Sequence, residues 1–234
     1  MSTSTELIVA LDVSSIAEVE ALLFKLRGSV TLFKVGLQLF TAHGKRAVDL
    51  VHRAGGRVFL DLKLHDIPQT VAHAVREAQR LGVHSLSVHL SSGRDVLEAA
   101  AAVHPRPKLW GVTVLTSLSS SDLEAIHPGA SVDPTVERLA ALGTRCGIDA
   151  VICSGKEVPM LRKALGAEAT FVTPGIRPAG SAVNDQKRVL TPGEAAGLGI
   201  RYIVVGRPIT HDADPLAVAQ AILTEIKNAA PRAA

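Results

Sequence analysis

Short apolar runs rich in leucine and β-branched residues recur along the chain, about 30 residues apart, which is the length of one strand–helix unit. Runs of this length and composition are typical of buried strands. Eight such runs are predicted to be strands: Leu7–Leu11, Leu32–Val35, Val58–Lys63, Ser85–His89, Leu109–Val114, Ala150–Cys153, Thr170–Val172 and Tyr202–Val205.

The segments between these runs have the pattern of helices. After the first run, Ser15 and Glu18 have the spacing of a capping box, apolar residues then follow at helical period, and Gly28 stands where a helix would end. After the third run, Pro68 suits the first turn of a helix, and Gly82 suits its end. Alternating strands and helices predict a parallel sheet, and eight units in 234 residues favour a closed (β/α)8 TIM barrel of the α/β class.

No linker, low-complexity tract or shift in composition divides the sequence, so we expect a single domain over residues 1–234, with the extreme termini (about 1–5 and 229–234) frayed. No signal peptide is evident, and no apolar run approaches the roughly 18 residues that span a membrane. Cys146 and Cys153 form no metal-binding motif and suit free thiols in a reducing compartment. These features predict a cytoplasmic protein.

The charge balance argues against a nucleic-acid-binding protein. The formal net charge is only +3, and no long run of Lys or Arg exists. Aromatic residues make up 3% of the chain, which leaves few side chains on which bases could stack.

Charged residues stand at the ends of the first three predicted strands. Asp12 follows the first, Lys34 lies in the second, and the third carries Asp61 and Lys63. Because side chains alternate along a strand, Asp61 and Lys63 share one face, while the leucines around them share the other. The carboxyl ends of barrel strands hold the active site in this fold, so we expect the four charges to meet there. A structural ion network closing one end of the barrel is the alternative.

A second polar constellation follows the last two strands. Arg177 lies in the segment Thr173-Pro174-Gly175-Ile176-Arg177-Pro178, and Gly206 and Arg207 lie in Gly206-Arg207-Pro208. The loops after strands seven and eight often hold a phosphate in this fold. A glycine lets backbone N–H groups approach an anion, and an arginine can bind two of its oxygens. The polar stretch 179–189 between them suits either a mobile lid or a plain solvated loop.

These motifs together resemble the orotidine 5′-phosphate decarboxylase family, and its bacterial branch in particular. The resemblance runs from about Leu7 to Pro215 and is most specific in three segments: Asp61–Thr70, Val172–Pro178 and Gly206–Thr210. It implies decarboxylation of orotidine 5′-phosphate to UMP and carbon dioxide, the last step of UMP biosynthesis. It also implies a homodimer with shared active sites and no cofactor or metal.

The resemblance further implies a role for each matching residue. Lys63 matches the general acid that protonates C6 of the pyrimidine, and Lys34, Asp61, Lys63 and Asp66 together match the charged tetrad of the family. Asp66 and Thr70 match residues that enter the neighbouring subunit's site. The remaining matches are substrate contacts: Asp12 and Lys34 to the ribose, Thr116 near the pyrimidine, Gln186 bridging phosphate and base, and Arg177, Gly206 and Arg207 at the phosphate.

Two other functions remain open at this level. A magnesium-dependent sugar-phosphate decarboxylase or aldolase of the same superfamily would share the barrel and the D-x-K-x-x-D spacing, but its second strand would offer a Glu to the metal where this chain has Lys34. A non-catalytic UMP-binding protein would need Arg177, Gly206 and Arg207 but not the triplet of Asp61, Lys63 and Asp66. No G-x-G-x-x-G motif or metal-ligand cluster is present in the sequence.

Overall fold

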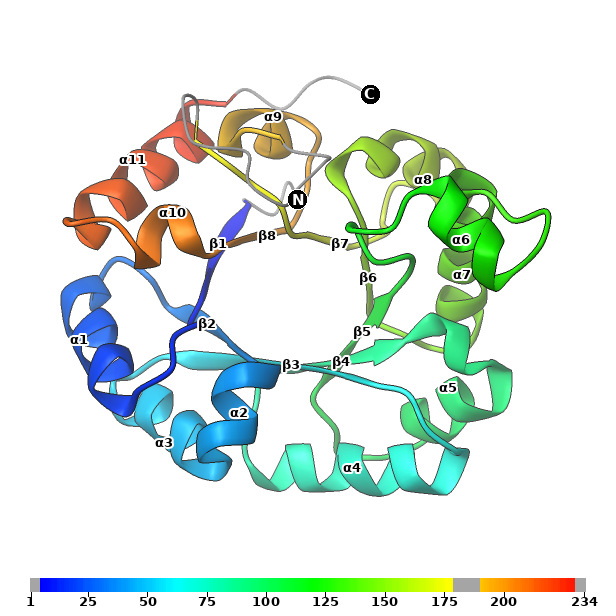
Figure 1. The fold of residues 1–234 in the computed structure, drawn as a ribbon, viewed down its shortest axis with the longest axis horizontal. Coiled ribbons are helices and arrows are strands. Elements are labelled where there is room, and N and C mark those ends of the chain that lie inside the picture. The colour runs from blue at the N-terminus through cyan, green and yellow to red at the C-terminus, as the bar shows by residue number, and fades with distance from the viewer. Residues whose placement is uncertain (1–4, 179–189, 230–234) are drawn as a thin grey trace.

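Eight parallel strands close into a barrel in the order in which they occur along the chain, and helices surround it (Figure 1). The computed structural model describes residues 5–178 and 190–229. The strands are β1 (Glu6–Ala10), β2 (Leu32–Gly36), β3 (Arg57–Leu64), β4 (Ser85–His89), β5 (Lys108–Val112), β6 (Ala150–Ile152), β7 (Phe171–Thr173) and β8 (Tyr202–Val205). The predicted (β/α)8 barrel is confirmed, with strand ends that differ from the predicted ones by up to two residues.

Helices follow the strands, as the alternating pattern predicts, including the two expected after the first and third strands. The longer ones are α1 (Ile16–Leu26), α2 (Leu37–His43), α3 (Lys45–Arg53), α4 (Pro68–Arg80), α5 (Arg94–Ala101), α6 (Ser120–Ile126), α7 (Val132–Arg145), α8 (Val158–Leu165), α9 (Pro192–Gly197) and α11 (Pro215–Asn228). One-turn helices lie at Leu90–Ser92, Gly155–Glu157 and α10 (Arg207–Thr210). Ser15 and Glu18 form the predicted capping box, and Gly28 and Gly82 adopt positive φ just past α1 and α4.

The core has two parts, because each strand alternates between the barrel interior and the helix-covered outside. The larger part lies between strands and helices and contains Leu60, with Leu62 and Leu64 packed against it. The smaller part fills the barrel interior and consists of Ile8, Ala10, Leu32, Phe59, Trp110, Ala150, Val172, Tyr202 and Val204. The predicted division of β3 into a leucine face and a charged face is therefore confirmed.

Aromatic rings form a floor inside the barrel. Trp110 on β5 is fully buried and packs against Phe59 of β3, with ring centroids 4.5 Å apart, and against Tyr202 of β8, at 4.8 Å. Below them, at the amino ends of the strands, Glu6 forms ion pairs with Arg57 and Arg201. The interior is thus filled below its middle, and open space is left for the carboxyl ends of the strands.

His84 lies half-buried beside this floor, with its ring 6.1 Å from that of Trp110. Burial, and next the positive charge of Arg57, lower the pKa of His84 to about 4. An unfolded histidine takes up its proton near pH 6.5, so between about pH 6.5 and pH 4 the unfolded chain binds one more proton than the folded chain. Acidification through this window therefore favours unfolding.

We expect His84→Gln to weaken this acid sensitivity. Thermal unfolding followed from pH 7.5 to 4.5 should show a smaller drop in Tm for the variant than for the wild type, because the variant has no proton to gain at this position. The exposed His127→Gln serves as the control and should follow the wild-type curve. Parallel curves for His84→Gln and the wild type would contradict the assignment.

No helix in the described ranges is both long and apolar enough to cross a membrane. Cys146 and Cys153 are both buried and stand outside any disulfide, as the sequence predicts. The fraying expected at the termini concerns mainly residues 1–4 and 230–234, which lie outside the described residues. The lid considered for residues 179–189 also lies outside them.

Candidate active site

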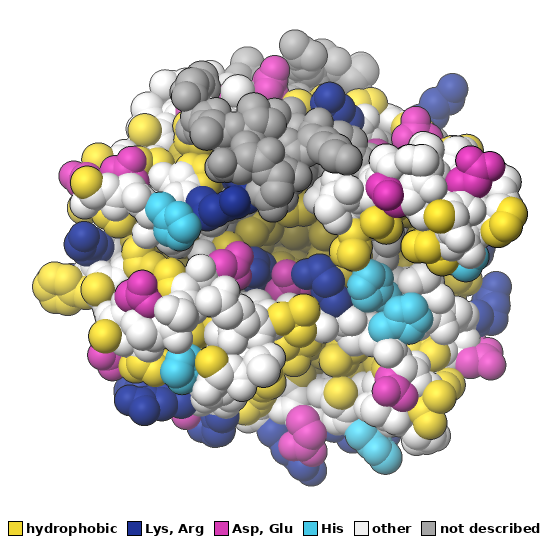
Figure 2. Space-filling model, viewed as in Figure 1, with side chains coloured by type: hydrophobic (Ala, Val, Ile, Leu, Met, Phe, Trp, Pro, Cys, Tyr) yellow, Lys and Arg dark blue, Asp and Glu magenta, His cyan; other side chains and the backbone are white. Residues whose placement is uncertain are grey.

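Four charged side chains meet in a row at the carboxyl ends of the first three strands. The Lys34 ammonium lies 2.7 Å from Asp12 Oδ1 and 3.8 Å from Asp61 Oδ2. The Lys63 ammonium lies 2.8 Å from the same Asp61 Oδ2. Acids and lysines thus alternate as Asp12, Lys34, Asp61 and Lys63, which is the meeting of charges that strand alternation predicts. Figure 2 shows acidic and basic side chains gathered in the hollow at the centre of this face.

Asp61 is the centre of this row and is the most enclosed of the four. Its side chain is 10% exposed, against 12% for Lys34, 29% for Lys63 and 48% for Asp12. Burial, the largest influence, raises the pKa of Asp61, but Lys34, Lys63 and a hydrogen bond from Ser87 together hold that pKa below its ordinary value. Asp61 is therefore a carboxylate, and it presents a fixed negative charge to both lysines.

Gly36, at the end of β2, leaves room for this row. A Cβ atom at position 36 would lie 2.6 Å from Lys34 Nζ and 3.0 Å from Asp12 Oδ1. The first distance is shorter than real Cβ atoms show, so a side chain at position 36 would push the Lys34 ammonium from its place. Glycine at this position therefore leaves the room in which Lys34 meets Asp12.

Two adjoining cavities open on either side of the charged row. One, of about 200 Å³, lies among the apolar ends of the central strands and is lined by Lys34, Phe59, Asp61, Lys63, Val112, Val114, Leu115, Thr116, Ile152, Cys153, Val172, Pro174 and Val204. The other, of about 540 Å³, is polar and is lined by Ala10, Asp12, Lys34, Leu37, Gln38, Asp61, Lys63, Pro174, Gly175, Arg177, Val204, Gly206, Arg207 and His211. Lys34, Asp61 and Lys63 line both, so the charges lie at the junction between an apolar cavity and a polar one.

The predicted anion-binding residues line the polar cavity. Arg177 follows β7 and is buried, and Arg207 begins α10 directly after Gly206. The two arginines thus come from the loops after β7 and β8, which hold phosphate in many barrels of this kind. Thr116, after β5, lines the apolar cavity on the other side of the row.

Two predicted residues lie elsewhere, and a third is outside the part of the chain that the structure describes. Asp66 and Thr70 are exposed and line neither cavity of their own chain. The Asp66 carboxylate accepts a hydrogen bond from the Ile67 N–H at 2.7 Å, next to the start of α4. Gln186 lies outside the described residues.

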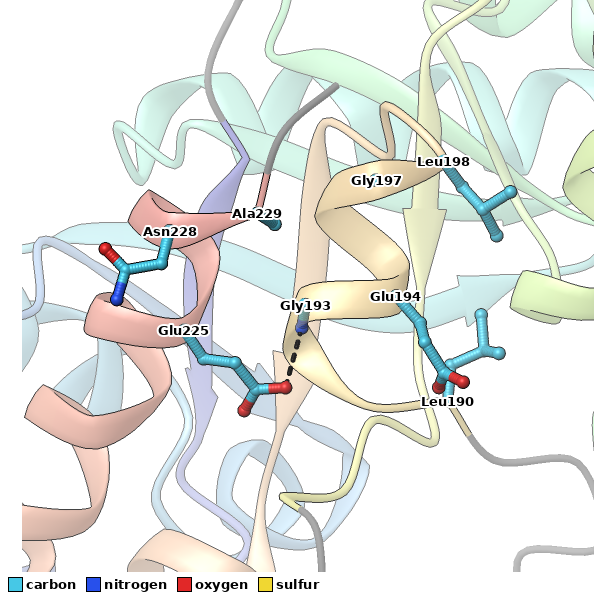
Figure 3. A pocket seen from close by; sticks show the side chains of 8 residues that line it. All are labelled: Leu190, Gly193, Glu194, Gly197, Leu198, Glu225, Asn228 and Ala229. Atoms are coloured by element: carbon cyan, nitrogen blue, oxygen red, sulfur yellow. Dashed lines mark hydrogen bonds between the residues drawn. The ribbon is translucent and has the colours of Figure 1, made fainter. Parts of the chain in front are cut away.

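A larger cavity, of about 580 Å³, lies on the outside of the barrel between α9 and α11 (Figure 3). Glu225 of α11 reaches across it and accepts a hydrogen bond from the Gly193 N–H of α9 at 2.9 Å. Its lining includes none of the predicted site residues. Because the hydrogen bond between Glu225 and Gly193 ties two helices together, we assign this cavity a role in packing and not in chemistry.

Some lining residues were not singled out by sequence reasoning. Phe59 and Val172 point into the barrel, and for Phe59 its place two residues before Asp61 on the same strand face could have indicated this. Gln38 and His211 line the polar cavity from the helices that follow β2 and β8, and no periodic signal marks them. Cys153 lines the apolar cavity, although its sequence context indicates only a buried thiol.

The fold is a closed (β/α)8 barrel, and acids and lysines alternate at the carboxyl ends of its strands, between an apolar cavity and an arginine-bearing one. This combination defines a (β/α)8-barrel enzyme. The model of the orotidine 5′-phosphate decarboxylase / HUMPS family matches residues 5–222, which is most of the chain. The chain therefore belongs to this family, and the resemblance seen in the sequence is confirmed.

Individual relatives agree with the family model. The orotidine 5′-phosphate decarboxylase of Moorella thermoacetica is 47% identical, with 97% of this chain and 94% of that protein covered. That of Syntrophotalea carbinolica is 46% identical, with 96% of each covered. Both come from bacteria, as the resemblance to the bacterial branch implies. A crystal structure of orotidine 5′-phosphate decarboxylase from Lactobacillus acidophilus is 36% identical, covers 95% of this chain and 99% of its own, and superposes with a TM-score of 0.83.

Proposed function

We propose that this chain converts orotidine 5′-phosphate to UMP and carbon dioxide, as the last step of pyrimidine nucleotide synthesis, with Lys63 as the proton donor and without a metal or cofactor. One observation carries the proposal: the Lys63 ammonium lies at the junction of an apolar cavity and an arginine-bearing cavity. A pyrimidine ring suits the first cavity and a phosphate suits the second, so the ammonium would stand beside the ring.

The chemistry needs a positive charge and a proton at one carbon. The bond between C6 and the carboxyl carbon breaks, its electron pair stays on C6, and carbon dioxide leaves. The Lys63 ammonium stabilises the developing negative charge and then transfers its proton to C6. Asp61, 2.8 Å from that ammonium, pairs with it and holds it in position.

Binding of the phosphate holds the substrate in place at a distance from the reacting carbon. In this proposal Arg177, Arg207 and the Gly206 backbone bind the phosphate oxygens. Asp12 and Lys34 contact the ribose hydroxyls, and Thr116 contacts the pyrimidine. Binding energy from the phosphate positions C6 against Lys63, so this group contributes to rate as well as to affinity. Gln186 would bridge phosphate and base.

We also propose that the enzyme is a cytoplasmic homodimer with shared active sites. Asp66 and Thr70 line neither of the two cavities at the charged row, and both are exposed near the start of α4. Ile67, between them, is 66% exposed and offers an apolar surface that a partner could cover. A partner subunit that covers Ile67 would receive the Asp66 carboxylate in its own site, which completes the charged tetrad.

The arrangement of Lys34 favours this function over a magnesium-dependent one. Its ammonium contacts Asp12 and lies 3.8 Å from Asp61, so the carboxylates that could bind a cation already face a positive charge. In the described ranges no group of three or more His, Cys, Asp or Glu side chains is placed to hold a metal ion. A divalent cation would have to displace Lys34 from this position.

Turnover in the presence of a chelator tests the proposal. The purified protein in excess EDTA should consume orotidine 5′-phosphate, seen as loss of orotate absorbance, at the same rate as without EDTA. Absence of turnover with and without added Mg²⁺, together with tight binding of UMP, would instead support a nucleotide-binding protein. Turnover that EDTA removes and Mg²⁺ restores would support the magnesium-dependent alternative.

A further inference from the structure

The backbone of β3 is irregular where it carries its charged side chains. Residues Phe59 and Leu60 pair with Ser85 and Leu86 of β4, but the pairing resumes only at Leu64, opposite Val88. Between these two pairs the chain moves on by four residues in β3 but by only two in β4, so β3 contains a bulge. The bulge contains both Asp61 and Lys63, so its conformation decides how these two side chains point.

Lys63 has φ +50°, the one positive φ at a residue other than glycine in the described ranges. This left-handed conformation brings Cβ close to the backbone and is unfavourable for a residue with a side chain. Backbone of this kind persists where its surroundings hold it and is concentrated at functional sites. Some contact must therefore hold Lys63 in place.

Ser87 of β4 makes that contact. Its Oγ accepts a hydrogen bond from the Lys63 backbone N–H at 2.8 Å and donates one to Asp61 Oδ1 at 2.8 Å. The direction of each bond is fixed, since an amide N–H can only donate and a carboxylate can only accept. Ser87 is fully buried, so water has no access to replace either bond.

We propose that Ser87 is a positioning residue for the decarboxylation: its single hydroxyl fixes the Lys63 backbone and the Asp61 carboxylate together, so that the Lys63 ammonium is presented to the substrate. Asp61 is held on both oxygens, by Ser87 at Oδ1 and by the ammonium at Oδ2. Ser87 lines neither cavity, so it would act through Lys63 and Asp61 and not on the substrate directly. The inference rests on the function proposed above and adds a residue to it.

The same strand supplies a matched control. Ser85 lies two residues before Ser87, on the same inward face, and is equally buried. Within the part of the chain that the structure describes, Ser85 Oγ has no hydrogen-bond partner. Loss of this hydroxyl therefore removes no bond, whereas loss of the Ser87 hydroxyl removes two from the residues that carry the chemistry.

The test compares kcat, KM and their pH dependence for the wild type, Ser87→Ala and Ser85→Ala. We expect Ser87→Ala to lower kcat about 10- to 100-fold with KM within about threefold, because a bond to each of two catalytic groups is lost while the phosphate site is intact. The acid limb of the kcat profile should move to higher pH, since Ser87 helps to keep Asp61 ionised. Ser85→Ala should match the wild type.

A second pair of variants covers the case in which Ser87→Ala does not fold. Ser87→Thr keeps a hydroxyl and Ser87→Val replaces it by a methyl group of similar shape, so the proposal expects higher kcat for threonine than for valine. Equal kcat in this pair, wild-type kcat in Ser87→Ala at every pH, or equal losses in Ser87→Ala and Ser85→Ala would each overturn the proposal.

Amide hydrogen exchange separates this inference from the function on which it rests. A peptide spanning residues 60–64 should exchange faster in Ser87→Ala than in Ser85→Ala, whether or not the protein decarboxylates anything. An inactive wild type with this difference would refute the proposed reaction and leave the role of Ser87 in holding Lys63. An active wild type without the difference would refute the role of Ser87 alone.

Discussion

Replacing Lys63 with alanine should reduce kcat for orotidine 5′-phosphate by at least about 10,000-fold, because one ammonium supplies both the charge that stabilises the carbanion and the proton that quenches it. The loss should appear in kcat more than in the affinity for UMP, since the proposed phosphate-binding residues Arg177 and Arg207 are unchanged in this variant. The measurements are steady-state decay of orotate absorbance and binding of UMP by calorimetry.

Lys45→Ala is a suitable control for the Lys63 variant. Lys45 also forms an ion pair with an aspartate, Asp49, but its side chain is 67% exposed and lies in α3, outside both cavities. Loss of a surface ion pair has little effect on stability or rate, so this variant should keep wild-type kcat. Wild-type turnover by Lys63→Ala would refute the assignment of the proton donor.

Mixing two inactive variants should restore activity if each site draws on both subunits. In a hybrid of Lys63→Ala and Asp66→Asn chains, one site combines an intact Lys63 with an intact Asp66 from the partner, while the other site has lost both. Random reassociation makes about half of the dimers hybrid, so activity should rise to about one quarter of the wild-type value per site. The measurement is turnover after partial denaturation and refolding of the mixture.

A mixture of Lys63→Ala with Lys34→Ala chains is the matched control for this experiment. Lys34 and Lys63 of one chain contact the same Asp61, so both variants damage their own site and no hybrid contains an intact one. This mixture should remain inactive. Restoration in both mixtures, or in neither, would contradict a site to which the partner contributes Asp66.

The barrel could be predicted from the sequence because its signal is repeated eight times. Each strand–helix unit has its own apolar run, and some also have a signal at a helix end, such as the capping box of Ser15 and Glu18. An error of a residue or two at one strand end does not change the predicted fold, because the fold rests on eight such units. Strand alternation also places Lys34, Asp61 and Lys63 on the inward faces correctly, since a period of two leaves only two choices of face.

Features that depend on contacts between distant residues could not be predicted. Strand alternation treats Lys63 as part of a regular strand, but the residue lies in a bulge with positive φ. No local pattern distinguishes Ser87 from Ser85, which share a strand, a face and a residue type; only the position of β3 against β4 gives one of them two partners. The roles proposed for Asp66 and Thr70 would likewise depend on a second chain, which no local pattern within one chain describes.

The aromatic floor of the barrel has an optical consequence. Trp110 is the only tryptophan of the chain, and it packs against Phe59, which lines the apolar cavity. All tryptophan emission of the native protein therefore comes from a ring that only Phe59 separates from the apolar cavity, where the nucleobase would lie in the proposed function. Arrival and departure of a ligand can be followed through this built-in fluorophore, without a label and without a substitution near the charged row.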